Sequence, residues 1–232
     1  MKKVVLSLVV IFITSFQLIC AQNYDVVYSL TMNPNNVIKM MSRETGVPKA
    51  MLSFLKDDIR NAKLMVALRI TKDKSDMKFL KDQSKFDINF MGTKIDGTSM
   101  FENGGINNYC DYASDIYYTK INLKGQNYII RIKPDPEPQY QPVNLYKKVL
   151  GHECKKMVDR KDNTVIWYAT DIPFTNKMFP NVPGLVLEIA EESEGMTLTA
   201  TLVKATDKDA ELPKNAKEVT KKEMKKIIDD MK

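Results

Sequence analysis

The chain has 232 residues, 35 Lys and Arg against 29 Asp and Glu, and a formal net charge of +6. Basic and acidic residues alternate along most of the sequence, which argues against a nucleic-acid-binding surface because such a surface needs basic residues gathered on one face. The length is typical of one β-rich domain and is sufficient to bury a sizeable core.

The amino terminus predicts an export signal. Lys2 and Lys3 precede a long apolar run, and the small residue Ala21 follows it. This order is typical of a secretory signal peptide, so we expect residues 1–21 to be removed and residues 22–232 to form a single β-rich domain. Removal of the two lysines leaves 33 basic against 29 acidic side chains, a net charge of +4. No later segment is apolar for long enough to span a bilayer as a helix.

Three cysteines occur in the sequence, and the first lies within the predicted signal. Cys20 follows Ile19 instead of a small residue, which favours soluble export over lipidation. Cys110 and Cys154 then remain as an even pair in a protein bound for an oxidising compartment. A disulfide between them is the first expectation and would stabilise the fold by roughly 4 kcal/mol. Two free buried thiols are the alternative.

Strands and short helices follow in chain order. Residues 24–32 alternate with period two and predict a half-buried strand. Residues 33–62 carry apolar side chains at helical spacing, with a break at Gly46 and a restart at Pro48, and predict two short helices or one broken helix with Val37, Met40, Met41, Met51, Leu52, Leu55 and Ile59 toward a sheet. Period two returns at residues 64–71, and a turn at 73–76 predicts a hairpin into residues 77–79. Further strands are predicted at 85–91, 114–123, 126–133, 152–158, 164–170, 183–189 and 195–203.

The remaining segments predict loops and one closing helix. Residues 101–114 are rich in Gly and Asn, and residues 133–142 are rich in Pro, so both are interpreted as solvated connections, with a functional loop over a pocket as the alternative. Thr220 and Glu223 have the spacing of a capping box, ahead of an apolar stripe typical of a docked amphipathic helix. Because strands follow one another without helical crossovers, the sequence predicts an α+β fold with a curved, mainly antiparallel, half-barrel-like sheet packed on short helices.

Catalytic motifs are absent from the sequence. It has neither HExxH nor GxSxG nor a P-loop, and His152 is its one histidine. His152 and Cys154 fall on the same face of a predicted strand, which suits a thiol and base pair or two metal ligands, but two ligands are too few for a structural zinc site. The acidic pairs at Asp57 and Asp58 and at Asp111 and Asp115 are interpreted as solvated turns. We therefore expect no catalytic residue, no metal and no cofactor.

Methionine is abundant, with 13 of the 14 residues beyond position 21. Its flexible, polarisable side chain suits irregular cores and also surfaces that accept variable apolar ligands. Core packing is the first interpretation, and an apolar ligand cavity is the second.

The stretch "NVPGLVLEI" (181–189) opens a predicted strand with Pro and Gly. Together with "GHECKKM" and "WYATDIPF" it resembles the GLPGLI family of exported proteins from Gram-negative bacteria. The resemblance covers about residues 145–200. The matching residues are Gly151, Cys154, Lys156, Trp167, Tyr168, Ile172, Pro173, Pro183, Gly184 and Leu185. Asn181, Val182 and Val186 depart from the family motif, and the Gly-Pro usual between the later segments is missing. The C-terminal segment is also similar to a neighbouring family of secreted domains of unknown function.

The resemblance implies a β-rich fold and a periplasmic, secreted or outer-membrane-associated location, and it brings no catalytic residues. Three functions stay open at this point. The first is non-catalytic binding of an apolar small molecule or lipid in a cavity of the sheet, and the second is binding to a protein partner in the cell envelope. The third is a thiol enzyme that uses Cys154 and His152.

Overall fold

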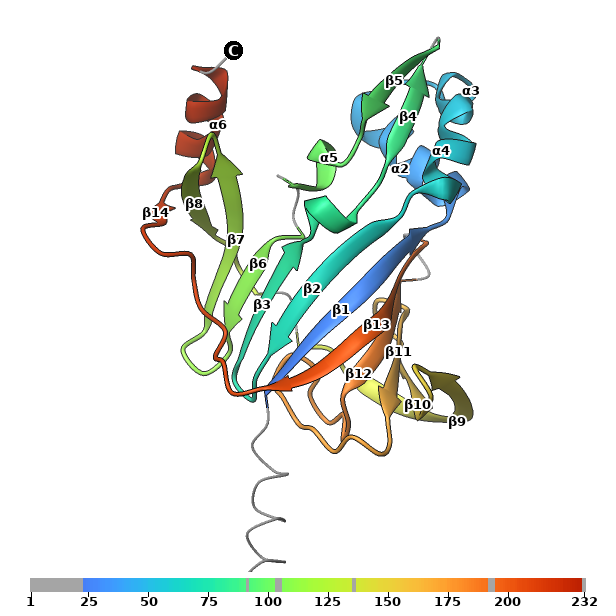
Figure 1. Cartoon of the computed structure of the whole chain (residues 1–232), viewed down its shortest axis with the longest axis vertical. Coiled ribbons are helices and arrows are strands. Elements are labelled where there is room, and N and C mark those ends of the chain that lie inside the picture. The colour runs from blue at the N-terminus through green and yellow to red at the C-terminus, as the bar shows by residue number, and fades with distance from the viewer. Residues whose placement is uncertain (1–22, 91, 103–105, 135–136, 192–194, 231–232) are drawn as a thin grey trace, which may run out of the picture.

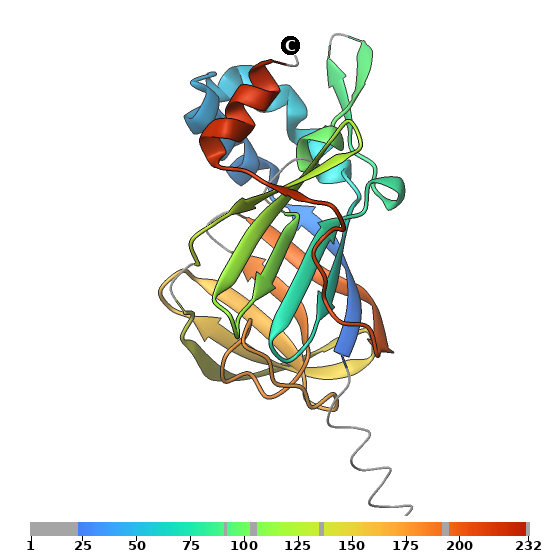
Figure 2. The same ribbon diagram turned by 90° about the vertical axis from the view of Figure 1, so that its left-hand side faces the viewer.

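The computed structural model describes residues 23–90, 92–102, 106–134, 137–191 and 195–230. The predicted signal peptide, residues 1–21, lies outside these ranges. The chain has an α+β fold dominated by one twelve-stranded sheet, in the order β14-β8-β7-β6-β3-β2-β1-β13-β12-β11-β10-β9. The pairings are antiparallel apart from the parallel pair β14 and β8. The sheet is strongly curved, so that β9–β13 and β3–β8 lie on opposite sides of a shared interior (Figures 1 and 2).

The strands of this sheet are β1 (Asn23–Met32), β2 (Leu64–Ile70), β3 (Lys74–Phe79), β6 (Asn108–Asp111), β7 (Ile116–Leu123), β8 (Gln126–Arg131), β9 (Tyr140–Val149), β10 (His152–Asp159), β11 (Thr164–Ala169), β12 (Val186–Glu191), β13 (Met196–Thr206) and β14 (Lys217–Glu218). A separate hairpin pairs β4 (Asp87–Phe90) with β5 (Thr93–Asp96). The helices are α2 (Pro34–Thr45), α3 (Lys49–Leu52), α4 (Lys56–Asn61), α5 (Ser99–Glu102) and α6 (Lys221–Asp229), with 3-10 turns η1 (Ser53–Leu55) and η2 (Lys81–Gln83).

The central strands follow the alternation predicted from the sequence. In β1 and β2 every second side chain is buried on the concave face, while the residues between them are half-buried. Each aliphatic side chain moved out of water in this way stabilises the fold by about 1.5–3 kcal/mol. The buried set is Tyr24, Val26, Tyr28, Leu30, Leu64, Val66, Leu68 and Ile70.

The helical segment after β1 covers one end of the concave face. Asn33 caps α2 by accepting a hydrogen bond from the backbone N–H of Asn35 at 3.0 Å, and Gly46 ends the helix with a φ of 73°, a left-handed conformation that favours glycine. Two details differ from the prediction. Pro48 is the N-cap of α3 instead of its first residue, and Met51 is 66% exposed because α3 is a single turn with no buried residue.

Two apolar clusters fill the concave side. The upper cluster joins the helices to the ends of β1 and β2 through Val37, Ile38, Leu55, Ile59, Leu30 and Leu64. The lower cluster lies between β1, β2 and β10–β12 and includes residues from the long connection 170–185, which enters the interior. In that connection Phe174 packs edge-on against Tyr24, with ring centroids 5.1 Å apart. The connection therefore acts as an internal plug for the lower half of the curved sheet.

Two segments predicted as loops contain regular structure. The interval 101–114 contains the end of α5 and all of β6. Tyr109 of β6 is buried in an apolar cluster that includes residues of the chain after β13. The Pro-rich interval 133–142 ends inside β9, which includes Pro142. This position is allowed because β9 is the last strand of the sheet, so a residue without a backbone N–H costs no ladder hydrogen bond on the open side.

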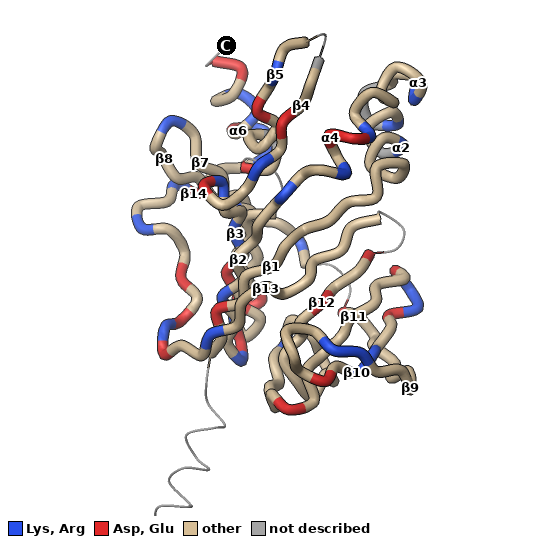
Figure 3. Tube along the Cα trace, turned by 45° about the vertical axis from the view of Figure 1, so that its right-hand side comes forward, with Lys and Arg blue, Asp and Glu red and all other residues tan. Residues whose placement is uncertain are grey.

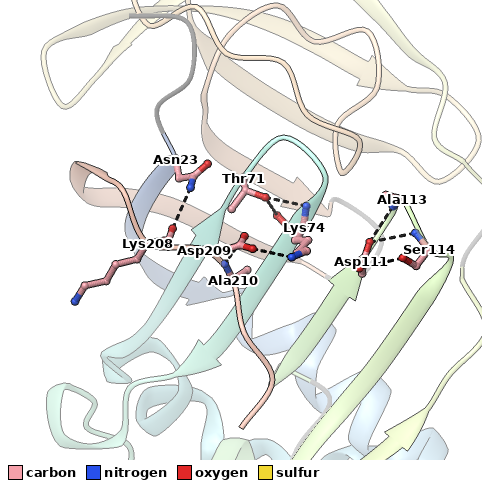
Figure 4. Close-up of polar contacts among 9 residues, drawn as sticks. All are labelled: Asn23, Thr71, Lys74, Asp111, Ala113, Ser114, Lys208, Asp209 and Ala210. Carbon is pink, nitrogen blue, oxygen red and sulfur yellow. Dashed lines mark hydrogen bonds and ion pairs between the residues drawn. The ribbon is translucent and has the colours of Figure 1, made fainter. Parts of the chain in front are cut away.

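The chain after β13 returns over the convex face. Figure 4 shows its first turn against the tip of the β2–β3 hairpin, where Lys74 contacts Asp209 at 2.6 Å and Asn23 donates to the carbonyl of Lys208 at 3.0 Å. Ala210 and Leu212 then pack on Tyr109 and Tyr118. The segment continues into β14 and α6, where Thr220 and Glu223 form a capping box. In the described ranges no helix is long and apolar enough to cross a membrane.

Candidate functional site

An apolar recess of about 110 Å³ lies on the concave face between the two clusters. Met196 and Leu30 belong to the upper cluster, Ile189 and Met77 belong to the lower one, and Leu198 contacts both. The recess therefore exists where the helices and the internal plug leave the middle of the sheet uncovered. Its lining is Leu30, Val66, Met77, Ile106, Ile189, Glu191, Met196 and Leu198.

A second and larger pocket, of about 730 Å³, opens on the same concave side between β6–β7 and the plug. Its volume falls within the range of about 300–1,000 Å³ that is usual for small-molecule sites. The lining combines aromatic, apolar, polar and charged side chains, namely Asn108, Cys110, Tyr112, Tyr117, Ile132, Lys133, Pro134, Glu137, Pro138, Lys177 and Met178. Described residues of the Pro-rich segment thus line the pocket, while a functional role for the segment stays a prediction.

The register of the sheet places the two spaces side by side. Met77 of β3 is directly opposite Asn108 of β6, and paired residues of neighbouring strands share a face. Met77 lines the recess and Asn108 lines the larger pocket. An apolar compartment is therefore adjacent to a mixed compartment across one strand pair, an arrangement that suits a molecule with one apolar end and one polar end.

Hydroxyl and thiol groups in and beside the larger pocket stay protonated at neutral pH. Burial raises the pKa of the Cys110 thiol, although hydrogen bonds from Tyr112 and Ser75 partly oppose the change. Burial also raises the pKa of Tyr112, whose hydroxyl lies 3.0 Å from the hydroxyl of Ser75. The ring of Tyr117 meets the ring of Tyr112 edge-on at 5.8 Å. In their protonated forms the Cys110 thiol and the Tyr112 hydroxyl are hydrogen-bond donors.

The side chains of His152 and Cys154 bond to different partners. The Cys154 side chain is fully buried and its thiol donates to the carbonyl of His152 at 3.6 Å. Burial raises the pKa of that thiol, which is the opposite of what thiolate chemistry requires. The Nδ1 atom of His152 instead lies 2.8 Å from a carboxylate oxygen of Asp171, at the surface.

The disulfide expected between Cys110 and Cys154 is not formed, and both residues are free thiols. Cys110 lies on β6 and Cys154 on β10, and six strands separate β6 from β10 in the order of the sheet. Cys110 lines the larger pocket, and Cys154 lies in the lower cluster. This agrees with the alternative interpretation of two unpaired thiols.

Residues that carry the family resemblance lie on β10 and the turn before it, on β11 and on the plug. Trp167 lies on β11 with the ammonium group of Lys147 4.5 Å from its ring centroid, whereas Tyr168 and Leu185 are buried in the lower cluster. Pro173 and Pro183 are exposed within the plug segment. The matching residues therefore fix how the plug enters and leaves the sheet, and none of them lines either space on the concave face.

Acidic residues singled out in the sequence serve as local structure. Asp111 accepts hydrogen bonds from the backbone N–H groups of Ala113 and Ser114 at 3.1 Å and so stabilises the β6–β7 turn (Figure 4). Asp58 binds the backbone and side chain of Asn89. No three His, Cys, Asp or Glu side chains gather at a metal-binding distance in the part of the chain that the structure describes.

Sequence reasoning did not identify the residues of the larger pocket. Asn108, Tyr112 and Tyr117 lie in or next to a segment interpreted as a solvated loop, because its Gly and Asn content outweighs its short apolar pattern. The available signal was the density of tyrosine between residues 109 and 118, since large aromatic side chains seldom concentrate in a solvated connection.

Comparison with known proteins assigns no family. No family model and no curated protein match the chain. Two solved structures of PNGF-II are similar to it, with TM-scores of 0.48 and 0.47 and sequence identities of 15% and 16%. The match covers 90% of this chain and 33% of each PNGF-II chain, so the protein spans about a third of the length of these structures. A similarity of this size gives no basis for an argument about fold or function.

Proposed function

We propose that the protein is an exported, non-catalytic binding protein that holds an amphipathic small molecule or lipid within its curved sheet, which acts as a half-barrel. The observation that carries the proposal is the adjacency of an apolar recess and a larger mixed pocket across the pairing of Met77 with Asn108. The raised pKa values of the Cys110 and Tyr112 side chains agree with a site that donates hydrogen bonds and does not react.

The volumes define the kind of ligand. An apolar protein cavity of about 150 Å³ takes up benzene, so a recess of about 110 Å³ suits a short alkyl or small ring and not a complete acyl chain. The larger pocket has room for the remainder of a small molecule. Its charged lining residues are Lys133, Glu137 and Lys177, and the Lys177 ammonium group pairs with Asp73 at 3.3 Å, so the pocket favours a polar head.

Filling the recess tests the proposal. Val66 of β2 lines the recess, so Val66→Phe places an aromatic ring inside it. Val27→Phe, on the other face of β1, is the matched control. The probe is 8-anilinonaphthalene-1-sulfonate, which has an aromatic part and an anionic head. We expect fluorescence titration to give at least about a tenfold weaker affinity for Val66→Phe, since one excluded apolar group is worth about 1–3 kcal/mol. The control is expected to bind as the unaltered protein does.

Native mass spectrometry of gently purified protein provides the second measurement. We expect a reproducible added mass that is reduced by Val66→Phe and by Tyr117→Leu, which alters the larger pocket. Equal occupancy in Val66→Phe and the unaltered chain would reject the concave site. The absence of both an added mass and probe binding would reject a binding function.

The proposed location in the cell envelope rests on the signal-peptide pattern at residues 1–21 and on the resemblance to exported proteins. Mass analysis of the protein from fractionated cells is expected to find a chain that begins at Gln22 in the periplasmic or secreted fraction. Recovery of the chain with residues 1–21 from the cytosol alone would contradict the proposed location.

A partner-binding role is the second candidate, and the edge of the sheet favours it. Leu145, Tyr146 and Leu150 are 52%, 53% and 46% exposed, and they lie on β9 and its turn into β10. Exposed apolar groups beside an unpaired strand edge are typical of a protein contact. Cross-linking in cells is expected to capture a specific envelope protein, with the cross-link lost in Leu145→Asp/Leu150→Asp. Unchanged cross-links in that variant would reject the edge as a contact.

A further inference from the structure

Four large apolar side chains are exposed at the same end of the molecule. Met51 is 66% exposed, Phe54 45%, Ile95 47% and Ile228 39%. They belong to the consecutive elements α3 and η1 and to β5 and α6, which are far from them in the sequence. Figures 1 and 2 show α3, the β4–β5 hairpin and α6 together at one end of the long axis, while β1 begins at the opposite end.

Lysines lie within two or three positions of each of these apolar side chains in the sequence, together with fewer acidic residues. Lys49 and Lys56 flank the segment with Met51 and Phe54, and Lys94 directly precedes Ile95. Helix α6 carries four exposed lysines in nine residues, against two acidic residues, namely Lys221, Lys222, Lys225 and Lys226. Figure 3 shows basic positions on α2–α4, β5 and α6 at this end, with acidic positions among them on α4, β4 and β5. Acidic side chains at this end include Asp57, which pairs with Arg60 at 2.6 Å, and Asp87, which pairs with Lys94 at 2.9 Å.

We propose that this end, which we name the helical end and define by α3, η1, β4–β5 and α6, docks on the surface of an anionic lipid membrane. Single apolar side chains enter the boundary between headgroups and acyl chains, while the lysine stems extend beside them and place their ammonium groups at the lipid phosphates. Each lysine near an anionic leaflet adds a favourable contribution, and several together bind without a membrane-spanning segment.

A lipid surface fits these residues better than a protein partner does. The core of a protein interface is depleted of lysine and is contiguous, whereas the apolar side chains of the helical end come from three separate parts of the fold with lysines between them. A bilayer requires no shape complementarity, and it binds isolated apolar side chains and cations that lie side by side. The inference concerns a surface and not the concave pockets, so it does not depend on the proposed ligand.

Vesicle flotation with the protein purified as the cell processes it tests the docking. The probes are vesicles of phosphatidylcholine alone and vesicles with about one third phosphatidylglycerol, a share high enough to give a strongly negative surface. We expect binding to the anionic vesicles, weakened by added salt, and at least about tenfold weaker partition to phosphatidylcholine alone.

Two variants separate the apolar and the cationic contributions. Met51→Asp/Ile95→Asp and Lys221→Glu/Lys222→Glu/Lys225→Glu are each expected to lower partition at least about tenfold. Leu202→Asp is the matched control, because Leu202 is 55% exposed on β13, outside the helical end, and is expected to bind like the unaltered chain. Circular dichroism and 8-anilinonaphthalene-1-sulfonate binding show that each variant is folded and that its concave site is intact.

Three results would overturn the docking proposal. They are equal partition to neutral and anionic vesicles, equal losses in Leu202→Asp and the helical-end variants, and capture of a protein by the helical end without vesicle binding. None of them bears on ligand binding, which the same samples measure separately.

Discussion

Gly184 is fixed by a close approach of two backbone segments. A β-carbon at this position would clash with the carbonyl oxygen of Ala169 and would lie 2.8 Å from the ring of Tyr168. The neighbouring Leu185 accepts a hydrogen bond from the N–H of Ala169 at 2.9 Å, so the two segments cannot separate without loss of that bond. Gly184 therefore allows the last residues of the internal plug to pack closely against the end of β11.

Gly184→Ala is accordingly expected to lower the free energy of unfolding by about 2–3 kcal/mol, the cost of overpacking a core. Urea denaturation measures the change. Gly151→Ala is the control, because Gly151 has a φ of 83° and open space around it, so the substitution costs only backbone strain of about 1–2 kcal/mol. A smaller loss for Gly184→Ala than for Gly151→Ala would contradict the steric explanation.

The two thiols differ in access, although burial raises the pKa of both. Because only the thiolate is alkylated, iodoacetamide is expected to modify Cys110 more slowly than free cysteine at pH 7, with a rate that still rises as the pH passes about 9. Cys154, which has no exposed surface, is expected to react only after denaturation. Peptide mass mapping at a series of pH values checks both rates. Fast labelling of Cys154 in the folded protein would restore the thiol-enzyme hypothesis.

At the scale of elements, period-two patterns predicted the central strands because one face of each is buried. β2 follows this pattern from end to end, and β1 follows it as far as Leu30. The pattern fails for β6, which has four residues, and for β9, whose outer residues face solvent at an edge. Strands of this kind depend on pairing with distant segments and leave little trace in local sequence. The pockets were unpredictable for the same reason, since Met77 and Asn108 meet only through the pairing of β3 with β6.

Helix α6 depends on its N-cap. Thr220 accepts a hydrogen bond from the N–H of Glu223 at 3.2 Å, and a carboxylate oxygen of Glu223 accepts one from the N–H of Thr220 at 2.7 Å. Thr220→Ala is expected to destabilise the helix by about 1 kcal/mol. Hydrogen exchange of the α6 amides measures the loss, with the exposed substitution Lys222→Ala as control.

The same cap gives α6 a pH dependence. The hydrogen bonds from the backbone and side chain of Thr220 lower the pKa of the Glu223 carboxyl below its ordinary 4.5. The stabilisation is therefore complete above about pH 5 and is lost as the pH falls through the lowered pKa in the folded state. The α6 amides are expected to exchange faster, relative to those of β1, as acid is added. Glu223→Gln, which removes the titrating carboxyl, is expected to abolish this difference, whereas Thr220→Ala keeps the backbone donor and is expected to remove only part of it.

At the scale of the whole molecule, charges of alternating sign cross the convex face. Arg69 of β2 contacts Asp25 of β1 at 2.7 Å and lies opposite Asp76 of β3 in the ladder. Asp76 forms an ion pair with Lys120 of β7, across the intervening β6, and both side chains of this pair are largely buried. The row spans five neighbouring strands, four of which contribute a charge, so it links the centre of the sheet to the half that carries the larger pocket.

Lys120→Met should leave the Asp76 carboxylate buried without its ion-pair partner, and removal of one partner from a buried pair costs about 3 kcal/mol. Urea denaturation is expected to show this loss, and Asp76→Asn/Lys120→Met is expected to recover part of it because no buried charge then remains. A double variant as unstable as the sum of both single variants would mean that the two side chains act independently.

The order of the strands predicts how the molecule opens. β1, β2 and β13 are bonded on both sides at the centre of the sheet and contribute to the two apolar clusters, whereas β9 and β14 end the sheet in the described part of the chain. Local opening needs the least energy where one side of a strand is unpaired and few apolar contacts hold it. Native-state hydrogen exchange should therefore show the slowest amides in β1, β2 and β13 and the fastest strand amides in β9 and β14. Protection of β9 equal to that of β1 would mean that another chain or segment covers this edge, as the partner-binding hypothesis requires, and removal of that protection by Leu145→Asp/Leu150→Asp would identify the contact.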